Sequence, residues 1–202
     1  MQSNSYLVLK LNRKFSIPKP LLIVLVGVAG SGKSTLANEI ALKLDNSAFL
    51  SKDLIQSSFS SERVGGELYS LIRGPTFKAL VTFADTQLSH GKTPIIDCPF
   101  SRNHTYDDKY RDWPLYFKKI AQKHKTELVI IRCKAPSEKE LKKRIAKRNY
   151  SWDKPKLLNW TWWIEYEPQD FPIPSKDVHE VITNLKPSNL AEKVLKEIIK
   201  VN

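Results

Sequence analysis

The nine residues GVAGSGKST, at positions 27–35, combine glycines, a lysine and hydroxyls in a spacing that suits phosphate binding. Four of them satisfy the pattern G-x-x-x-x-G-K-[S/T]: Gly27, Gly32, Lys33 and Ser34. Such a loop needs glycine because its backbone must adopt positive φ angles and come close to phosphate oxygens. We therefore predict that the loop cradles the phosphates of a nucleotide. The predicted contact residues are Gly27, Ala29, Gly30, Ser31, Gly32, Lys33, Ser34 and Thr35.

The neighbours of this loop fit the same prediction. The apolar run LLIVLV at 21–26 is typical of a strand buried on both faces, and a helix is expected to start near Lys33. The positive end of that helix would add to the attraction for phosphate. Lys33 would neutralise the β- and γ-oxygens, and Ser34 would ligate Mg²⁺. A glycine-rich turn without a ligand is the alternative, and the strand–loop–helix context argues against it.

Asp53 lies in SKDLIQ, at the end of the second expected strand. The carboxyl ends of strands in an open parallel sheet line the ligand crevice. We predict that Asp53 binds the phosphate acceptor and takes the proton of its attacking hydroxyl. Asp53 is also a good candidate to cap the next helix, and the two roles can coexist.

The stretch IIDCPFSR at 95–102 supplies two further candidates. Asp97 ends an apolar strand, where a carboxylate would hold Mg²⁺. This stretch resembles small P-loop kinases in which an arginine follows such an aspartate, and the resemblance implies that Arg102 reaches the substrate. The alternatives are a turn residue for Asp97 and a solvent-exposed arginine for Arg102.

Arg144 and Arg148 are four residues apart and so share one face of an expected helix. Guanidinium groups there could stabilise the charge of a transferring phosphoryl group as catalytic residues, with Lys33 and Asp53. The alternative is a solvated basic helix face or a nucleic-acid patch, since residues 138–156 hold more lysine and arginine than acid.

The elements that must position these residues alternate along the chain. Strands are expected at 21–26, 48–50, 93–97, 127–133 and 179–183. Helices are expected at 34–44, 74–91 with Pro75 near the start, 112–124, 137–148 and 187–200. This alternation predicts parallel pairing and an α/β fold, a three-layer α/β/α sandwich around a mainly parallel sheet of about five strands. We place an N-terminal extension at 1–19 and one domain at 20–202, with a helical lid at about 137–168.

Composition narrows the setting of the protein. The formal net charge of +12 over 202 residues favours anionic partners. Cys98 and Cys133 lack metal-ligand spacing and lie in apolar runs, so a reduced, cytoplasmic location is expected, with organelle targeting as the alternative. No apolar stretch is long enough for a membrane span, so no membrane partner is expected.

The sequence GxxGSGKST resembles the P-loop kinases, and the resemblance covers about residues 20–202. The strand-end Asp53 and the 140–149 helix are similar to the polynucleotide kinase, zeta-toxin and chloramphenicol phosphotransferase branch. Members described only as AAA family ATP-binding proteins have a similar lid exit, matched here by Lys154, Pro155, Trp160 and Tyr166. Its aromatic side chains would either stack on an acceptor or form a satellite core. By its position after the last expected strand, the loop 184–188 would hold the nucleobase together with a lid arginine. The alternative is a strand-to-helix turn in which Pro187 starts the final helix.

The resemblance implies an ATP- and Mg²⁺-dependent kinase that moves the γ-phosphate to a hydroxyl. The acceptor would be a small metabolite, a nucleoside or the 5′ end of a nucleic acid. A nucleotide-dependent binding or regulatory ATPase module without a dedicated acceptor is the alternative. ATP is preferred over GTP because no NKxD motif is present. The sequence does not assign an oligomeric state.

Overall fold

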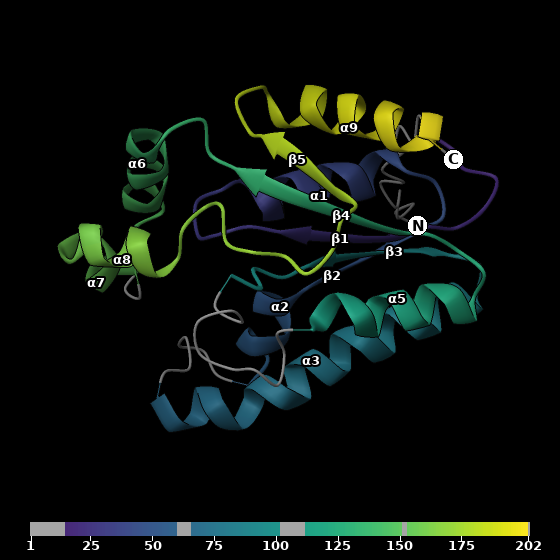
Figure 1. Cartoon of the computed structure of the whole chain (residues 1–202), viewed down its shortest axis with the longest axis horizontal. Helices are drawn as coiled ribbons and strands as arrows, with labels where there is room; N and C mark the ends of the chain where they lie inside the picture. Colours follow the sequence, from purple (N-terminus) through teal and green to yellow (C-terminus); the bar gives the residue numbers. More distant parts are fainter. Residues whose placement is uncertain (1–14, 60–65, 102–111, 151–152, 202) are drawn as a thin grey trace, which may run out of the picture.

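The computed structural model describes residues 15–59, 66–101, 112–150 and 153–201. These residues form a five-stranded sheet in the order β2-β3-β1-β4-β5, with every neighbouring pair parallel (Figure 1). The predicted α/β sandwich with a five-stranded parallel sheet is confirmed. The strands are β1 (Leu22–Val26), β2 (Ser47–Ser51), β3 (Thr93–Asp97), β4 (Leu128–Lys134) and β5 (Val178–Ile182).

Strand β1 lies at the centre because both of its faces are apolar. Leu22, Val24 and Val26 pack into one hydrophobic cluster. Ile23 and Leu25 pack into a second cluster on the opposite face. Every residue of β1 is fully buried, which explains why the strand is a continuous apolar run in the sequence.

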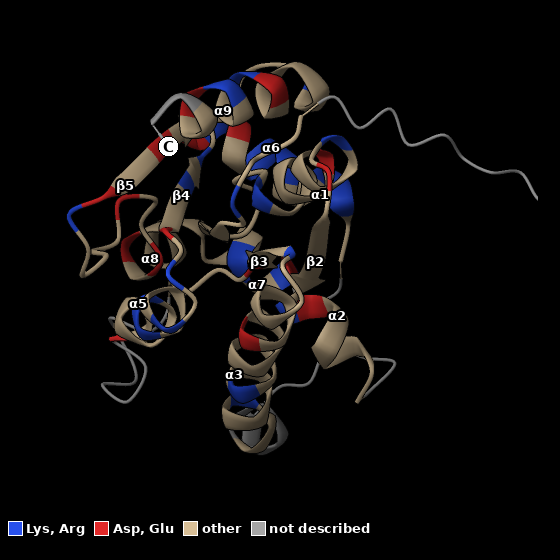
Figure 2. Ribbon diagram, turned by 90° about the vertical axis from the view of Figure 1, so that its right-hand side faces the viewer, with Lys and Arg blue, Asp and Glu red and all other residues tan. Residues whose placement is uncertain are grey.

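Helices cover both faces of the sheet. Helices α1 (Lys33–Lys43) and α9 (Pro187–Val201) pack together on the face of the Ile23 cluster. Helices α3 (Gly66–Ser89) and α5 (Trp113–Lys123) cover the other face. Figure 2 shows the two helical layers on either side of the strands. No helix in the described ranges is both long and apolar enough to cross a membrane.

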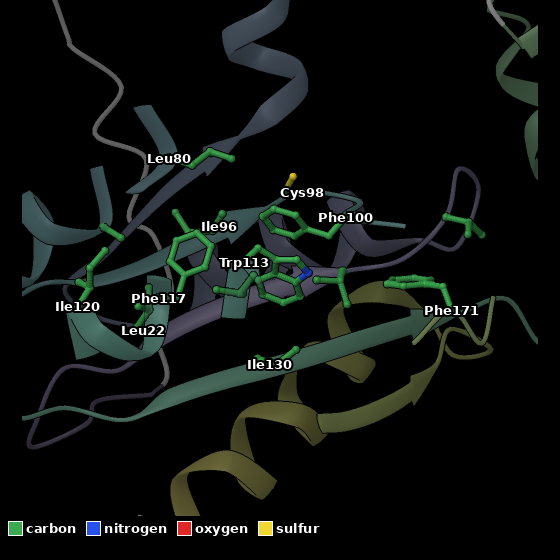
Figure 3. Packing of buried hydrophobic residues seen from close by; sticks show 14 of the residues in the cluster. Leu22, Leu80, Ile96, Cys98, Phe100, Trp113, Phe117, Ile120, Ile130 and Phe171 are labelled. Atoms are coloured by element: carbon green, nitrogen blue, oxygen red, sulfur yellow. The ribbon is translucent and has the colours of Figure 1, made fainter. Parts of the chain in front are cut away.

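An aromatic cluster fixes the chain where it leaves β3 (Figure 3). The Phe100 ring stacks on Trp113 at a centroid distance of 4.2 Å and an interplanar angle of 9°. Phe100 has a φ of 50°, a left-handed conformation that is costly for a bulky residue and must be held by its packing. The turn that results brings the Pro99 carbonyl to the Gly27 amide, at 3.3 Å. The exit of β3 is thereby joined to the glycine-rich loop.

Four short helices complete the carboxyl edge of the sheet. They are α2 (Lys52–Ser57), α6 (Glu138–Arg148), α7 (Lys154–Leu158) and α8 (Trp160–Tyr166). Figure 1 shows α6, α7 and α8 gathered beyond the arrowhead of β4. All three fall within the segment 137–168 that the sequence predicts as a lid.

One expected helix start differs from the structure. Pro75 was expected near a helix start, but α3 already begins at Gly66 and contains Pro75. Proline leaves the carbonyl of Leu71 without its helical donor, and Leu71 is an exposed residue. In the segment predicted as an extension, Phe15 exchanges backbone hydrogen bonds with Lys43 and Asp45, at 3.1 and 2.8 Å. This part of the segment therefore contacts the domain.

Candidate functional site

The glycine-rich loop has the backbone conformation that its sequence suggests. Gly27, Gly30 and Gly32 have φ angles of 149°, 80° and 89°. A β-carbon on Gly30 would lie 2.9 Å from Cγ1 of Ile145, and one on Gly27 would lie 2.6 Å from the carbonyl oxygen of Cys133. Glycine is therefore required at 27 and 30 for two reasons. The φ angles disfavour other residues, and β4 and α6 leave no room for a side chain.

Several amides of this loop are available to a ligand. The N–H groups of Gly30, Gly32 and Lys33 donate no hydrogen bond to any group in the described parts of the chain. Helix α1 begins at Lys33 with no side-chain cap and with no acidic residue in its first turn. Its positive end is therefore not compensated from within the described residues, which is the arrangement of an anion site.

Lys33 is a largely buried lysine next to these amides. The residue is 9% exposed, and its ammonium makes no ion pair or hydrogen bond with any described group. A largely buried lysine without a counter-ion in the described residues is expected where an anionic ligand supplies the opposite charge. Ser34 and Thr35 follow in the first turn of α1 and are exposed.

Asp97 ends β3 directly beside the loop. In the sheet register it lies between Leu25 of β1 and Ser51 of β2. Its carboxylate is 2% exposed, and Oδ2 accepts a hydrogen bond from Ser51 Oγ at 3.0 Å. Oδ1 is buried without a hydrogen-bond partner among the described groups. A carboxylate oxygen left in this state suits a hard cation, so Asp97 and the Ser34 hydroxyl fit the expected magnesium ligands.

Asp53 lies in the first turn of α2, immediately after β2. Its side chain is exposed, and its backbone amide donates to Ser51 Oγ at 3.2 Å. Ser51 is thus the residue that caps α2, and the capping role considered for Asp53 is wrong. The Asp53 carboxylate engages no other described group and is free to meet an acceptor. Its catalytic role stays a prediction.

A second buried cation at this edge was not predicted from the sequence. Lys52 is almost fully buried, although it precedes the exposed Asp53. Burial raises the pKa of the neighbouring Cys98 thiol to about 12, against the opposing charges of Lys52 and Lys33. Both ammonium groups therefore lie within electrostatic reach of Cys98. Lysine is so rarely buried that its position next to a strand end gave no usable signal.

Arg144, on α6, is turned toward the end of β5. Its Nη1 and Nη2 donate to the hydroxyl and the carbonyl oxygen of Thr183, each at 2.7 Å. Its Nε donates to Glu140 Oε1 at 3.0 Å. All three guanidinium nitrogens are thus occupied within the protein. The predicted contact between Arg144 and a phosphoryl group is untested.

Arg148 lies one turn further along α6 and has a different partner. Its Nε and Nη2 donate to the two carboxylate oxygens of Asp153, the latter at 2.8 Å. Lys156 also donates to Asp153, at 2.7 Å. Burial alone would raise the pKa of Asp153, but the hydrogen bonds from Arg148 and Lys156 outweigh it and lower that pKa. Nη1 of Arg148 is not used in these contacts and remains available to a ligand.

The sequence of this chain matches a known protein family. A family model described as AAA domain matches residues 22–160, about two thirds of the chain. The chain belongs to this AAA domain family. The matched range includes the glycine-rich loop, Asp53, Asp97 and both α6 arginines. No curated protein matches the sequence.

Solved structures share the fold of this AAA domain. A provisionally assigned kinase from Chloroflexus aurantiacus has a TM-score of 0.64 at 19% identity, with 91% of this chain and 98% of that chain covered. The APS kinase CysC of Mycobacterium tuberculosis, solved with AMPPNP and APS, has a TM-score of 0.57 at 17% identity, covering 90% and 99%. Kti12 from Chaetomium thermophilum, solved with ADP-AlF3, has a TM-score of 0.57 at 20% identity, covering 89% and 97%. The predicted membership of the P-loop kinase-like NTPases is confirmed.

The tryptophan-rich segment of the AAA domain divides between the core and the surface. Trp163 is buried in the main hydrophobic cluster, and Nε1 of Trp160 donates to Glu138 Oε1 at 2.5 Å. Trp162 is 58% exposed and stacks on Tyr166 at a centroid distance of 4.7 Å. These contacts fit the satellite-core alternative for Trp163 and leave an exposed aromatic pair on α8.

The loop 184–188 and Arg102 are the remaining residues predicted to contact a ligand. In the loop 184–188, Pro187 begins α9 as its position suggested, and residues 184–187 are exposed. Arg102 lies outside the described residues. The carboxyl edge of the sheet therefore gathers the glycine loop, Lys33, Ser34, Asp53 and Asp97, with α6 packed against Gly30.

Proposed function

We propose that this AAA domain is an ATP- and Mg²⁺-dependent phosphotransferase that moves the γ-phosphate to a hydroxyl. The acceptor is a small metabolite, a nucleoside or a polynucleotide 5′ end. The proposal depends most on one observation. Lys33 is largely buried with no counter-ion among the described groups, and it follows loop amides that donate no hydrogen bond to any of those groups. A polyphosphate supplies the negative charge and the hydrogen-bond acceptors that this arrangement lacks.

The loop and Lys33 bind and orient the triphosphate. The amides of Gly30, Gly32 and Lys33 donate to phosphate oxygens, and the positive end of α1 adds attraction. The Lys33 ammonium neutralises charge that builds up on the β- and γ-oxygens during transfer. Because the lysine is already buried and ordered, its alignment costs little at the moment of reaction.

Ser34 and Asp97 hold the metal in this proposal. The unpartnered, buried Oδ1 of Asp97 is the group that most clearly needs a cation. The Ser51 hydroxyl donates to Oδ2 and keeps the carboxylate oriented. Mg²⁺, when bound, would offset the charge of the β- and γ-phosphates.

Asp53 acts on the acceptor. The acceptor oxygen forms a bond to the γ-phosphorus while the bond from that phosphorus to the bridging β–γ oxygen breaks and ADP leaves. The hydroxyl proton passes to the Asp53 carboxylate, which is exposed and unpaired within the described residues. Arg102 is proposed to bind the acceptor, on sequence grounds alone.

Arg148 stabilises the transferring group. Its Nη1 remains free while Nε and Nη2 are held by Asp153, so the guanidinium is already oriented when a phosphate arrives. Leu141 and Ile145 of α6 face Gly30. Arg148 lies three residues beyond Ile145 and therefore projects from the same side of the helix.

A transfer screen tests the proposal. The purified protein is incubated with γ-phosphate-labelled ATP, Mg²⁺ and separate pools of nucleosides, sugars, other metabolites and 5′-hydroxyl oligonucleotides. We expect labelled product from one pool, and loss of that product in Lys33→Ala. In Asp53→Asn, transfer should fall by about 10²- to 10⁴-fold while ATP binding persists.

Three results of this screen contradict parts of the proposal. Near-normal transfer by Asp53→Asn removes the assignment of the base. Slow ATP hydrolysis that no acceptor changes favours the regulatory ATPase alternative. Failure of calorimetry to detect Mg·ATP binding overturns nucleotide binding itself.

A further inference from the structure

Thr183 connects the lid helix α6 with the glycine-rich loop, although no sequence motif includes it. It follows β5 directly, is buried, and its amide donates to the Lys134 carbonyl at 2.9 Å. Its hydroxyl lies 2.8 Å from the carbonyl oxygen of Ser31 and 3.1 Å from that of Lys134. Thr183 therefore reaches from the sheet into the phosphate-binding loop.

Arg144 decides which way the Thr183 hydroxyl points. Nη1 of Arg144 donates to the hydroxyl oxygen at 2.7 Å, so this oxygen acts as an acceptor toward α6. Its single proton is then left for the other side, where the Ser31 carbonyl is the nearer acceptor. The charge-assisted hydrogen bond from Arg144 also polarises the Thr183 hydroxyl. This polarisation strengthens the hydrogen bond that the hydroxyl donates to the Ser31 carbonyl.

The Ser31 carbonyl belongs to the same peptide group as the Gly32 amide. A trans peptide is planar, and its C=O and N–H point in opposite directions. When Thr183 holds the Ser31 oxygen on one side of the loop, the Gly32 N–H must point to the other side. That N–H donates to no described group and is one of the amides assigned above to phosphate.

Gly32 also lies against Thr183 itself. A β-carbon on Gly32 would come within 3.1 Å of three atoms of the Thr183 side chain. The threonine therefore supports this peptide by contact as well as by hydrogen bonding. Glycine at 32 serves the close approach in addition to its φ of 89°.

We propose that Arg144, Thr183 and Ser31 form a relay that aims the Gly32 amide at a bound phosphate and couples the position of α6 to nucleotide affinity. Arg144 and Thr183 are positioning residues in this relay. The inference depends on the proposed nucleotide binding. It gives Arg144 a different task from Arg148, whose Nη1 remains open to a ligand.

The test measures the affinity for Mg·ATP by calorimetry in matched variants. Thr183→Val keeps the shape but removes the hydroxyl, and we expect a loss of affinity of about tenfold, the effect of one polar contact. Thr183→Ser keeps the hydroxyl and should stay within about twofold of the unmodified protein. Arg144→Gln should resemble Thr183→Val. The double variant Thr183→Val/Arg144→Gln should be no weaker than Thr183→Val alone, because both remove the same relay.

Lys143→Gln is the matched control for Arg144→Gln, since Lys143 is the preceding residue on α6 and is 75% exposed. Its affinity should not change. An amide chemical shift of Gly32 that moves in Thr183→Val but not in Thr183→Ser would report the relay without any ligand. Thermal unfolding checks that each variant is folded. If Thr183→Val fails to fold, Arg144→Gln still tests the relay, because it replaces a partly exposed side chain.

Two outcomes overturn the relay. One is unchanged affinity in both Thr183→Val and Arg144→Gln while Lys33→Ala binds more weakly. The other is strictly additive losses in the double variant. If the unmodified protein binds no nucleotide, the proposed function fails, and the Gly32 chemical shift still decides whether the relay exists.

Discussion

The carboxyl and amino edges of the same sheet differ in how they treat their polar groups. At the carboxyl edge, Ser31 Oγ and Asp97 Oδ1 are buried without a described partner, and the ammonium of the largely buried Lys33 has no counter-ion among the described residues. At the amino edge, Asn46 Nδ2 donates to the Gly91 carbonyl at 2.7 Å, and the Leu21 amide donates to Thr93 Oγ1 at 3.2 Å. These polar groups of the amino edge are paired within the chain, whereas those of the carboxyl edge have no partner among the described residues.

A cavity of about 600 Å³ nevertheless lies near the amino edge, between α5, β4, β5 and α9. None of the buried unpartnered side-chain atoms in the described residues belongs to its lining. Lys118, Glu127 and Asp177 around it carry opposite charges and select no obvious ligand. Unsatisfied polar groups therefore mark the candidate site better than empty volume does.

Replacing a lysine at each edge gives the largest expected contrast. Lys33→Ala should lower phosphoryl transfer by about 10³-fold, because a preorganised charge is lost where negative charge develops. Lys118→Ala, at the lining of the amino-edge cavity, should leave transfer and ATP affinity unchanged. Transfer rates and calorimetry measure both. Loss of activity in Lys118→Ala would show that the cavity near the amino edge takes part.

Gly30 at the carboxyl edge and Gly91 at the amino edge should differ in how much an alanine substitution lowers the stability of the fold. Gly30 and Gly91 have φ angles of 80° and 68°, but only Gly30 is crowded, since a β-carbon on Gly91 would meet nothing within 4 Å. Gly91→Ala should cost about 1 kcal/mol from backbone strain alone. Gly30→Ala adds a clash with Ile145 and should cost about 3 kcal/mol and abolish ATP binding. Urea unfolding and calorimetry test this, and equal costs would contradict it.

Two aspartates provide a smaller contrast. Asp153 is buried with Arg148 and Lys156, whereas Asp85 is partly exposed with Lys123 and His124. Asp153→Asn should destabilise the fold by about 3 kcal/mol, because it removes the buried carboxylate charge that Arg148 and Lys156 share. Asp85→Asn should cost less than about 1 kcal/mol, as exposed ion pairs usually do. Similar losses in urea unfolding would remove the distinction.

The ion pairs of Asp153 also predict how the stability of the fold depends on pH. The folded pKa of Asp153 is lowered, so its contribution is complete above the unfolded pKa of about 3.9. It is lost as the pH falls through the lower, folded pKa. Unfolding of the unmodified protein should therefore show a loss of stability below about pH 4 that is reduced in Asp153→Asn. An identical acid profile in that variant would contradict the assignment.

Much of the fold could be predicted from local pattern. The apolar run at 21–26 and the helix expected at 137–148 each depend on a pattern of a few residues, and the alternation of such runs indicates the fold class. The structure has the corresponding elements, and the Glu140 amide donates to Ser137 Oγ at 3.1 Å. The start of α3 could not be predicted because a proline signals a helix start locally, whereas α3 continues on the amino-terminal side of Pro75 as far as Gly66.

The candidate site divides in the same way. The sequence by itself determined the glycine-rich loop, Lys33 and the strand-end carboxylates, because each depends on residue type and on a short, fixed spacing. Only the tertiary structure decided that Lys52 is buried and that Arg144 donates to Thr183. Thr183 also meets the Ser31 carbonyl, 152 positions away in the sequence. These contacts join segments that meet only after the parallel sheet and the helices around it have formed, and no local pattern records such a meeting.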